Sequence, residues 1–271
     1  MAGLTAAHFL GEAGIEVIVV EQDNRLGGRI MSVRKGDDTI DVGAQFIHTN
    51  YKVTLELCRK FNLESDLVEM RSNDMMMRGG QVHIIPWGSL RIPAISLWSQ
   101  LKNLRQLGPV IRRRKSMALD GWRNLLDLDR LELATYARLK LNEELLEYTV
   151  RPHMKYAGAS KSRYVLAWPL GSFGEEIIGL SDPEIISAVA EELRKASPGD
   201  AASVESTSVV RHPHRYPQYR VGMFGKLLSF KASEGRPAGL YFAGDYTEGG
   251  LIEGAAQSGY KVAQRVIEKG P

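Results

Sequence analysis

The sequence predicts an α/β protein in which one α/β layer is built from both ends of the chain, with a mainly helical insert between them. Three observations support this fold class. Residues 2–14 are small and apolar at helical spacing, and residues 15–20 then form a β-branched run typical of a buried parallel strand. Residues 240–243 also predict a buried strand, and residues 252–267 repeat apolar side chains at helical spacing. The long middle segment has frequent leucines with interleaved charges, which indicates helices.

The composition is that of an ordinary globular protein and excludes several classes. The chain has 271 residues, of which 44% are hydrophobic and 25% charged, unlike a disordered, collagen-like or coiled-coil protein. Its single cysteine, Cys58, excludes an intrachain disulfide and a multi-cysteine metal site. A net charge of +3 does not favour nucleic acid as a partner, and no apolar run reaches the roughly 18 residues of a spanning helix. Residues 1–10 lack a basic leader segment, so we expect a cytoplasmic protein.

The other elements follow in chain order. We expect a helix over residues 53–63, a hairpin from residues 75–77 and 82–85, and mostly helix over residues 92–148. A further helix runs to about residue 196, with Asp182 as its N-cap and Pro183 in its first turn. Residues 207–210 predict a short strand. We therefore expect one domain formed by residues 1–50 and 206–271, and a helical insert over residues 51–205.

Glu21 is the first residue that points to a ligand. It follows the predicted strand 15–20 and lies 18 residues after Gly3. In dinucleotide-binding units, an acidic side chain roughly 20 residues beyond the glycine motif accepts hydrogen bonds from the ribose hydroxyls. Gly3 would then be the third glycine of that motif, the one that allows close helix–strand packing. A solvated glutamate at a strand end explains Glu21 alone equally well.

A glycine pair and an arginine come next, in Leu26-Gly27-Gly28-Arg29. Two glycines let the backbone approach a phosphate, and an arginine can donate two parallel hydrogen bonds to phosphate oxygens. A mobile turn with a surface arginine is the alternative interpretation.

The C-terminal block makes similar physical sense. A strand ending in Gly244-Asp245 would place a carboxylate at the edge of the sheet, where it can accept hydrogen bonds from sugar-type hydroxyls. Gly250, Gly254 and the following helix offer backbone N–H groups and the positive end of a helix dipole to an anionic ligand. A glycine-rich turn with an aspartate N-cap is the purely structural alternative.

Together these blocks resemble the flavin-containing amine oxidase and protoporphyrinogen oxidase superfamily. The resemblance rests on residues 2–7, Glu21 and residues 26–29, then Asp41-Val42-Gly43-Ala44-Gln45-Phe46, and finally residues 239–245 with Gly250 and residues 253–255. Residues 214–219, His-Arg-Tyr-Pro-Gln-Tyr, most resemble the protoporphyrinogen oxidase branch. Matching blocks at both ends and in the same order make the resemblance specific.

The resemblance implies a Rossmann-like FAD-binding domain and assigns roles within it. Glu21 would hold the adenosine ribose, Arg29 the pyrophosphate, and residues 43–45 the edge of the isoalloxazine ring. Asp245, with residues 254–255, would hold the ribityl and pyrimidine side. The candidate cofactor-binding residues are Gly3, Glu21, Gly27, Gly28, Arg29, Gly43, Ala44, Gln45, Gly244, Asp245, Gly254 and Ala255. No residue has a spacing that singles out a catalytic acid or base, and no metal site is expected.

The implied activity is that of an FAD-dependent oxidoreductase that oxidises a hydrophobic or amine-type small molecule by hydride transfer to flavin. The alternatives are a phytoene-desaturase-like or amine-oxidising flavoenzyme, and a truncated, non-catalytic relative that no longer holds FAD. The paired blocks argue against a nicotinamide-dependent enzyme. The helical insert, with the basic run of residues 112–115, can also touch an anionic membrane surface. Relative to the family pattern, we expect a first strand to be missing before residue 1 and a block to be missing near residues 157–174.

Overall fold

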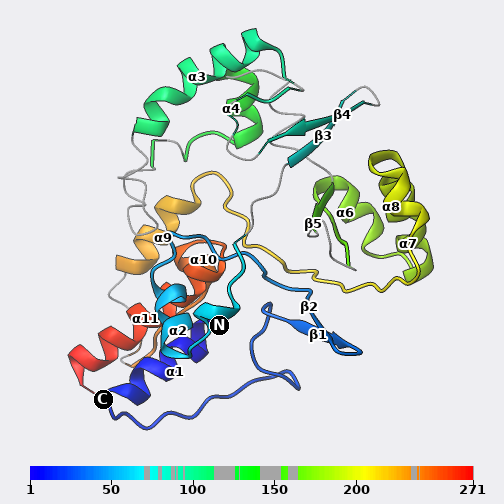
Figure 1. Ribbon diagram of the computed structural model, residues 1–271. Helices are drawn as coiled ribbons and strands as arrows, with labels where there is room; N and C mark the ends of the chain where they lie inside the picture. Colours follow the sequence, from blue (N-terminus) through cyan, green and yellow to red (C-terminus); the bar gives the residue numbers. More distant parts are fainter. Residues whose placement is uncertain are drawn as a thin grey trace. The chain divides into compact units, whose positions relative to one another are not determined.

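A computed structural model describes residues 1–69, 74–78, 81–86, 89, 91–93, 95–112, 126–127, 129–140, 154–157, 164–232, 237 and 239–270 (Figure 1). The chain divides into two compact units. The first comprises Met1–Val68, Lys115–Arg130 and His214–Pro271, so it combines the two ends of the chain. The second comprises Glu69–Arg114 and Leu131–Pro213.

The first unit is built mainly from helices of the two chain ends. Figure 1 shows α1, α2 and α11 side by side, and their contact forms a hydrophobic core. Phe9 of α1, Val53 and Leu57 of α2, and Ala256 and Ala263 of α11 are its buried members. The elements of this unit are α1 (Ala2–Glu12), β1 (Ser32–Lys35), β2 (Asp38–Asp41), α2 (Val53–Lys60), η1 (Glu64–Asp66), α9 (Met223–Ala232), α10 (Asp245–Glu248) and α11 (Ile252–Lys269).

The first helix begins and ends close to where the sequence predicts. Gly14 follows α1 with a φ of +77°, a left-handed conformation that glycine adopts without penalty. The Gly14 N–H donates to the Gly11 carbonyl at 2.9 Å, and the Ile15 N–H donates to the Leu10 carbonyl at 3.0 Å. These two bonds form a Schellman motif, which satisfies carbonyls at the helix end.

Small residues allow α11 to pack closely on α1. Ala256, Gly259 and Ala263 repeat at helical spacing on α11, and both alanines are fully buried. A Cβ atom at Gly259 would lie 2.2 Å from the Ala2 carbonyl oxygen, so only glycine fits at this crossing. The close approach brings the last helix of the chain against the first turn of α1.

The second unit contains two separate antiparallel strand pairs and several helices among the described residues. β3 pairs with β4 and β5 with β6 in this unit, as β1 pairs with β2 in the first. Ser181 is the N-cap of α7, where it forms a capping box with Glu184, so the expected N-cap at Asp182 is one residue too late. The elements are β3 (Asp74–Arg78), β4 (Gln81–Ile85), α3 (Leu97–Arg112), α4 (Leu133–Lys140), β5 (Met154–Ala157), β6 (Leu166–Pro169), α6 (Gly171–Ile177), α7 (Asp182–Ala196) and α8 (Pro198–Ala202).

Three expected strands are wrong. Residues 15–20, 207–210 and 240–243 form no strand in the structure. The side chains of Ile18 and Val20 are 86% and 89% exposed, although the sequence predicts a buried strand there. A strand exists only through hydrogen bonds to a neighbouring strand, and no described strand lies alongside these segments. The parallel sheet that the expected fold class contains is therefore absent from the described residues, where every pair is antiparallel.

Other expectations are confirmed. The hairpin forms as β3 and β4, and the helix from residue 53 forms as α2 followed by η1. Cys58 is buried in α2, and burial raises the pKa of its thiol, with a smaller contribution from Glu64. α3 and α4 lie within the expected helical insert, while residues 113–115 of the basic run lie outside the described residues. No helix in the described part of the chain is both long and apolar enough to cross a membrane.

Candidate functional site

Arg29 joins the two ends of the chain. Its Nη2 atom lies 2.7 Å from Oδ1 of Asp245, a carboxylate that is largely buried and 216 positions away in the sequence. Its Nη1 atom donates to the Arg215 carbonyl at 2.5 Å. The fork geometry of the guanidinium lets one side chain make both bonds. Two residues that the sequence assigns to one cofactor thus lie in direct contact.

The segment around Gly43 is held against the backbone of Arg29. The Ala44 N–H donates to the Arg29 carbonyl at 3.1 Å, and the Gly43 N–H donates to the Met31 carbonyl at 3.0 Å. A Cβ atom at Gly43 would lie 2.1 Å from the Arg29 carbonyl oxygen, so the close approach requires glycine. The Gln45 side chain donates to the Asp41 carbonyl and stays within its own segment. The structure therefore places residues 43–44 beside Arg29.

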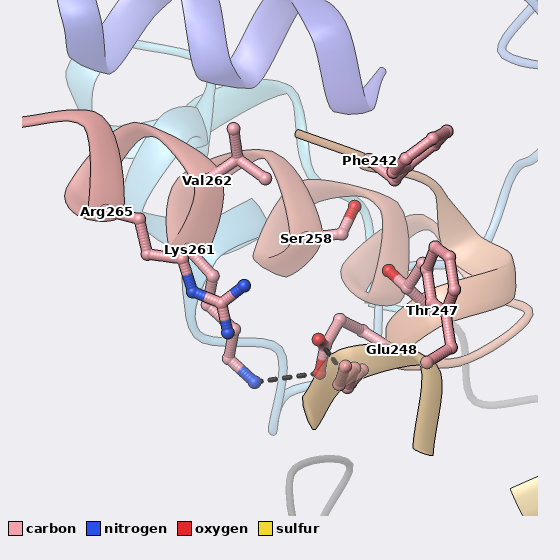
Figure 2. Close-up of a pocket in the computed structure, with 9 residues that line it drawn as sticks. Phe242, Thr247, Glu248, Ser258, Lys261, Val262 and Arg265 are labelled. Atoms are coloured by element: carbon pink, nitrogen blue, oxygen red, sulfur yellow. Dashed lines mark hydrogen bonds and ion pairs between the residues drawn. The ribbon is translucent and has the colours of Figure 1, made fainter. Parts of the chain in front are cut away.

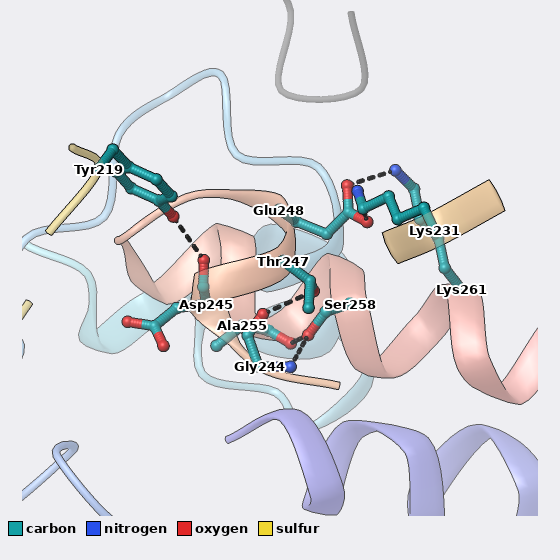
Figure 3. A network of polar contacts seen from close by, with 9 residues as sticks. All are labelled: Tyr219, Lys231, Gly244, Asp245, Thr247, Glu248, Ala255, Ser258 and Lys261. Atoms are coloured by element: carbon teal, nitrogen blue, oxygen red, sulfur yellow. Dashed lines mark hydrogen bonds and ion pairs between the residues drawn. The ribbon is translucent and has the colours of Figure 1, made fainter. Parts of the chain in front are cut away.

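Asp245 begins the short helix α10 at a point fixed by several hydrogen bonds (Figure 3). The Tyr219 hydroxyl donates to the Asp245 carbonyl at 2.9 Å, and the Gly244 N–H donates to Ser258 Oγ at 2.9 Å. Burial raises the pKa of Tyr219 to about 12, and the carboxylates of Asp245 and Glu248 add to the rise. The Tyr219 hydroxyl is therefore a proton donor throughout the ordinary pH range.

Gly254 lies in the first turn of α11, where the chain passes back over itself. A Cβ atom at this position would lie 1.9 Å from the Gly249 carbonyl oxygen, too close for any other residue. The Ala255 N–H donates to the Leu251 carbonyl at 3.1 Å, which closes the first turn of the helix. The fold thus explains the glycine at residue 254 by backbone packing, independently of any ligand.

Electrostatic contacts place the start of α1 near the same side chains. The pKa of the amino group at Met1 is lowered from its ordinary value, mainly by burial and also by the positive charge of Arg29. The negative charges of Glu21 and Asp245 act in the opposite direction and partly offset this decrease. All three side chains are therefore within electrostatic range of Met1, the N-cap residue of α1. Glu21 itself is exposed, and its carboxylate accepts hydrogen bonds from the Gln22 and Asp23 N–H groups.

The remaining candidate residues have simpler surroundings. Gly27 and Gly28 have φ angles of +104° and +59°, which only glycine adopts readily, and the Arg25 side chain donates to carbonyls of this turn. The close packing expected at Gly3 is not present, because no described atom lies within 4 Å of a Cβ built there. In α1 and α11 that close approach belongs to Gly259 instead.

Glu253, to which the sequence analysis assigned no individual role, makes several buried hydrogen bonds. Glu253 is 1% exposed, and its carboxylate accepts hydrogen bonds from three backbone N–H groups at the start of α2 and from the Thr54 hydroxyl. An acidic residue in the first turn of a helix is usual, so its sequence position carries no signal of this role. Its partners are about 200 positions away, and only the tertiary structure identifies them.

A small pocket lies nearby but contains none of the candidate residues (Figure 2). Phe230 and Phe242 contribute ring contacts to it, with centroids 5.4 Å apart. Glu248 is buried beside it, and Lys231 and Lys261 pair with its two carboxylate oxygens at 2.6 and 2.8 Å. The described residues contain no cluster of three or more potential metal ligands. The pocket is accordingly part of the packing among α9, α10 and α11.

The chain matches the family model of flavin containing amine oxidoreductases over residues 1–169 and 153–267. The L-amino acid oxidase Cdc18 of Crotalus durissus cumanensis is 41% identical over 64 residues, which is 24% of this chain and 13% of that protein. The flavin-dependent L-tryptophan oxidase RebO of Lentzea aerocolonigenes is 34% identical over 96 residues, 34% of this chain and 20% of that protein. The coproporphyrinogen III oxidase of Staphylococcus aureus is 27% identical over 165 residues, 57% of this chain and 34% of that protein.

These alignments cover a minor part of each relative, from 13% for the Crotalus oxidase to 34% for the Staphylococcus enzyme. The two segments of the family match overlap at residues 153–169. Residues 157–169 of this overlap also belong to the stretch 157–174, where the sequence leads us to expect that a block of the family pattern is missing.

Proposed function

This chain belongs to the family of flavin containing amine oxidoreductases, and from that premise we propose that it binds FAD and acts as an FAD-dependent oxidoreductase. The observation that carries the proposal is the contact of Arg29 with Asp245 close to the start of α1. It unites a cation, a carboxylate and a helix N-terminus from the two ends of the chain. These are the groups that bind phosphate and sugar hydroxyls.

The groups present suit the polar parts of FAD. Arg29, whose side chain is 44% exposed, can turn from Asp245 to an incoming pyrophosphate, and the first turn of α1 adds its positive dipole end. Freed from Arg29, the Asp245 carboxylate can accept hydrogen bonds from ribityl hydroxyls. Glu21 is accessible for the adenosine ribose. The Thr5 hydroxyl, buried in the first turns of α1 without a hydrogen-bond partner among the described residues, is a further polar group available there.

In this proposal the flavin carries the redox chemistry, and the residues of the chain bind and orient it. When bound, the flavin supplies the hydride acceptor for a carbon–hydrogen bond next to nitrogen or in an unsaturated, hydrophobic substrate. The residues of this chain hold and orient the cofactor: Arg29 binds its diphosphate, and Gly43 and Ala44, fixed against the Arg29 backbone, line the ring system. Gly254 would present its backbone N–H group at the start of α11, next to Ala255, whose own N–H is used in the first turn of the helix.

A binding experiment tests this proposal. The purified chain should show flavin absorption bands, or acquire them on reconstitution with FAD. Arg29→Ala should weaken FAD binding about ten- to hundredfold, because a hydrogen bond to a charged group contributes about 1.5–3 kcal/mol. Arg211→Ala, which removes an arginine paired with Asp182 in the second unit, is the matched control and should bind FAD normally. A colourless chain that cannot be reconstituted overturns the proposal and favours a non-catalytic relative.

The names of the relatives indicate two classes of substrate for this chain. The tryptophan oxidase and the L-amino acid oxidases act on amino acids by their names, and the Staphylococcus enzyme acts on a porphyrinogen. We propose a hydrophobic or amine-type small molecule, and anaerobic reduction separates the two classes. Bleaching of the flavin by L-amino acids would establish amine oxidation, whereas bleaching only by a porphyrinogen would establish the protoporphyrinogen oxidase-like activity. Bleaching by neither would exclude both classes.

A separate observation favours contact between α3 and an anionic membrane surface. The burial pattern of this helix is the reverse of the usual one. Ser99 and Asn103 are buried, while large apolar side chains at helical spacing are exposed to solvent. The exposed side chains are Leu97 (60%), Trp98 (76%), Leu101 (60%) and Leu104 (61%). Lys102, Arg105 and Arg112 are exposed on the same helix, which has no acidic residue. An apolar stripe flanked by cations matches the interfacial region of anionic lipid.

Co-sedimentation with lipid vesicles tests this contact. The chain should bind vesicles that contain phosphatidylglycerol and release them at high salt, because the attraction is partly electrostatic. Reversal of two charges, Lys102→Glu with Arg105→Glu, should reduce binding at least tenfold. The same reversal at Lys35 and Lys269, which lie outside α3, should not. Equal binding to neutral phosphatidylcholine, or self-association through α3 with no lipid binding, would contradict the proposal.

A further inference from the structure

Glu253 occupies an unusual position in the first unit. Its side chain extends from the first turn of α11 to the N-terminus of α2, where the carboxylate is almost completely buried. One oxygen accepts from the N–H groups of Lys52 at 2.7 Å and Val53 at 3.0 Å. The other accepts from the Thr54 N–H at 2.9 Å and the Thr54 hydroxyl at 2.7 Å. The Gln257 side chain donates a further bond at 2.9 Å.

These contacts make Glu253 the N-cap of a helix to which it does not belong. The first N–H groups of any helix lack partners within the helix, and a side chain just before the helix usually supplies them. Lys52, the residue in that place for α2, makes no such hydrogen bond. Glu253 therefore satisfies the α2 N-terminus from another element, and the dipole of α2 favours its negative charge.

The surroundings of Glu253 favour the ionised form of its carboxylate. Burial is the largest influence on the pKa of Glu253 and acts to raise it. The hydrogen bonds from Thr54, Val53 and Gln257 together outweigh burial, so the pKa is lowered from its ordinary value. A buried carboxylate with this many donors is held in one orientation.

Glu253 connects two segments that we propose to contact the cofactor. It directly precedes Gly254 and Ala255, the proposed contacts at the start of α11. The helix that it caps follows residues 43–45, the proposed contacts beside Arg29, and the chain between them is short and tightly turned. The Tyr51 N–H donates to the His48 carbonyl at 3.0 Å, and the Tyr51 side chain is buried. One carboxylate thus fixes the two proposed ring-binding segments relative to each other.

We propose that Glu253 is a positioning residue for the flavin site, which aligns residues 43–45 with Gly254 and Ala255 by capping α2 from α11. The proposal rests on the proposed function, since it assigns a role within the proposed FAD site. It goes beyond the proposed function because it assigns a role to Glu253, a side chain that is not among the proposed FAD contacts.

The test compares Glu253→Gln with a matched variant. Asp129→Asn is suitable because Asp129 also caps a helix from outside, accepting hydrogen bonds from the Gly222, Phe224 and Gly225 N–H groups at the start of α9. Both variants should lower the midpoint of thermal unfolding. Only Glu253→Gln should also weaken FAD binding, by about tenfold or more, and raise amide hydrogen exchange at residues 52–54 and 254–255.

A gentler pair keeps the test decisive if Glu253→Gln does not fold. Thr54→Val removes only the hydroxyl donor to Glu253, and Thr54→Ser restores it. The valine variant should bind FAD several-fold more weakly, and the serine variant should recover the wild-type affinity. Unchanged FAD affinity in every stable Glu253 and Thr54 variant would overturn the positioning role while wild-type binding stands. A wild-type chain that cannot bind FAD would instead overturn the proposed function itself.

Discussion

Individual buried acids set the geometry of the first unit. Asp245 pairs with Arg29, Glu248 pairs with Lys231 and Lys261, and Glu253 accepts five hydrogen bonds. Each of the three residues is buried, and a buried charge is tolerated only when such partners surround it. Loss of one partner would leave a buried charge uncompensated. The buried polar contacts therefore constrain which side chains can occupy these positions, as the apolar packing around them does.

Tyr219 should show this environment directly in an alkaline titration. Its pKa is raised to about 12 in the folded chain, above the value of about 10 for an unfolded tyrosine. The resulting stability is fully present below pH 10 and is lost as the pH rises towards 12. Ultraviolet absorbance of phenolate should show a tyrosine that ionises at about pH 12. Tyr219→Phe should remove that transition and Tyr216→Phe, at a side chain that is 56% exposed, should keep it. Persistence of the late transition in the Tyr219 variant would refute the assignment.

Whole helices meet through small residues. α11 contacts α1, α2 and α10, and its Gly259 lies against Ala2 and Ala6 in the first two turns of α1. The Schellman motif fixes where α1 ends, and the hydrogen bonds from the α2 N-terminus to Glu253 fix where α2 begins. The position of the proposed site therefore depends on how closely α1 and α11 approach.

Gly259→Ala tests this dependence. The new Cβ atom would lie 2.2 Å from the Ala2 carbonyl oxygen, and the helices would have to separate. We expect a loss of about 1–3 kcal/mol in the free energy of unfolding, the usual cost of overpacking. Gly11→Ala in α1 is the control, because nothing lies within 4 Å of its Cβ and helix propensity should raise stability by about 0.5–1 kcal/mol. Denaturant unfolding of both variants measures the difference, and equal stability would show that the crossing can relax.

At the scale of the whole molecule, the apolar segment of residues 15–20 is mostly exposed in the structure. Residues 15–20 have the side chains of a central strand, yet they pair with no described strand. An exposed, unpaired, β-branched segment is a template for association with another chain. The two compact units account for the remaining elements, each with its own packing.

Charged substitutions in this segment should suppress self-association. Ile18→Lys with Val20→Lys replaces two side chains that are more than 85% exposed, so folding should be unaffected. Light scattering should show less concentration-dependent association than in the wild-type chain. Val68→Lys adds a charge at an equally exposed valine outside the segment and should change nothing. A double variant that unfolds would show that these side chains are covered.

The sequence by itself determined much of the local structure and the family. Helices α1, α2, α7 and α11 follow from periodicity and from end signals such as the glycine at residue 14. The hairpin of β3 and β4 follows from the two runs at residues 75–77 and 82–85. These features depend on residues close together in the chain, and for that reason single-sequence patterns predict them.

Other features were decided only by contacts between distant segments. The β-branched segments 15–20 and 240–243 have strand-like sequences but form no strand, because a strand needs a partner. The ion pair of Arg29 with Asp245 was not predictable from spacing, although both residues were candidates. The role of Glu253 left no local trace, since its donors lie some 200 residues away. Sequence patterns specify what a segment can form; the tertiary structure decides which groups meet, because burial and hydrogen bonding depend on neighbours in space.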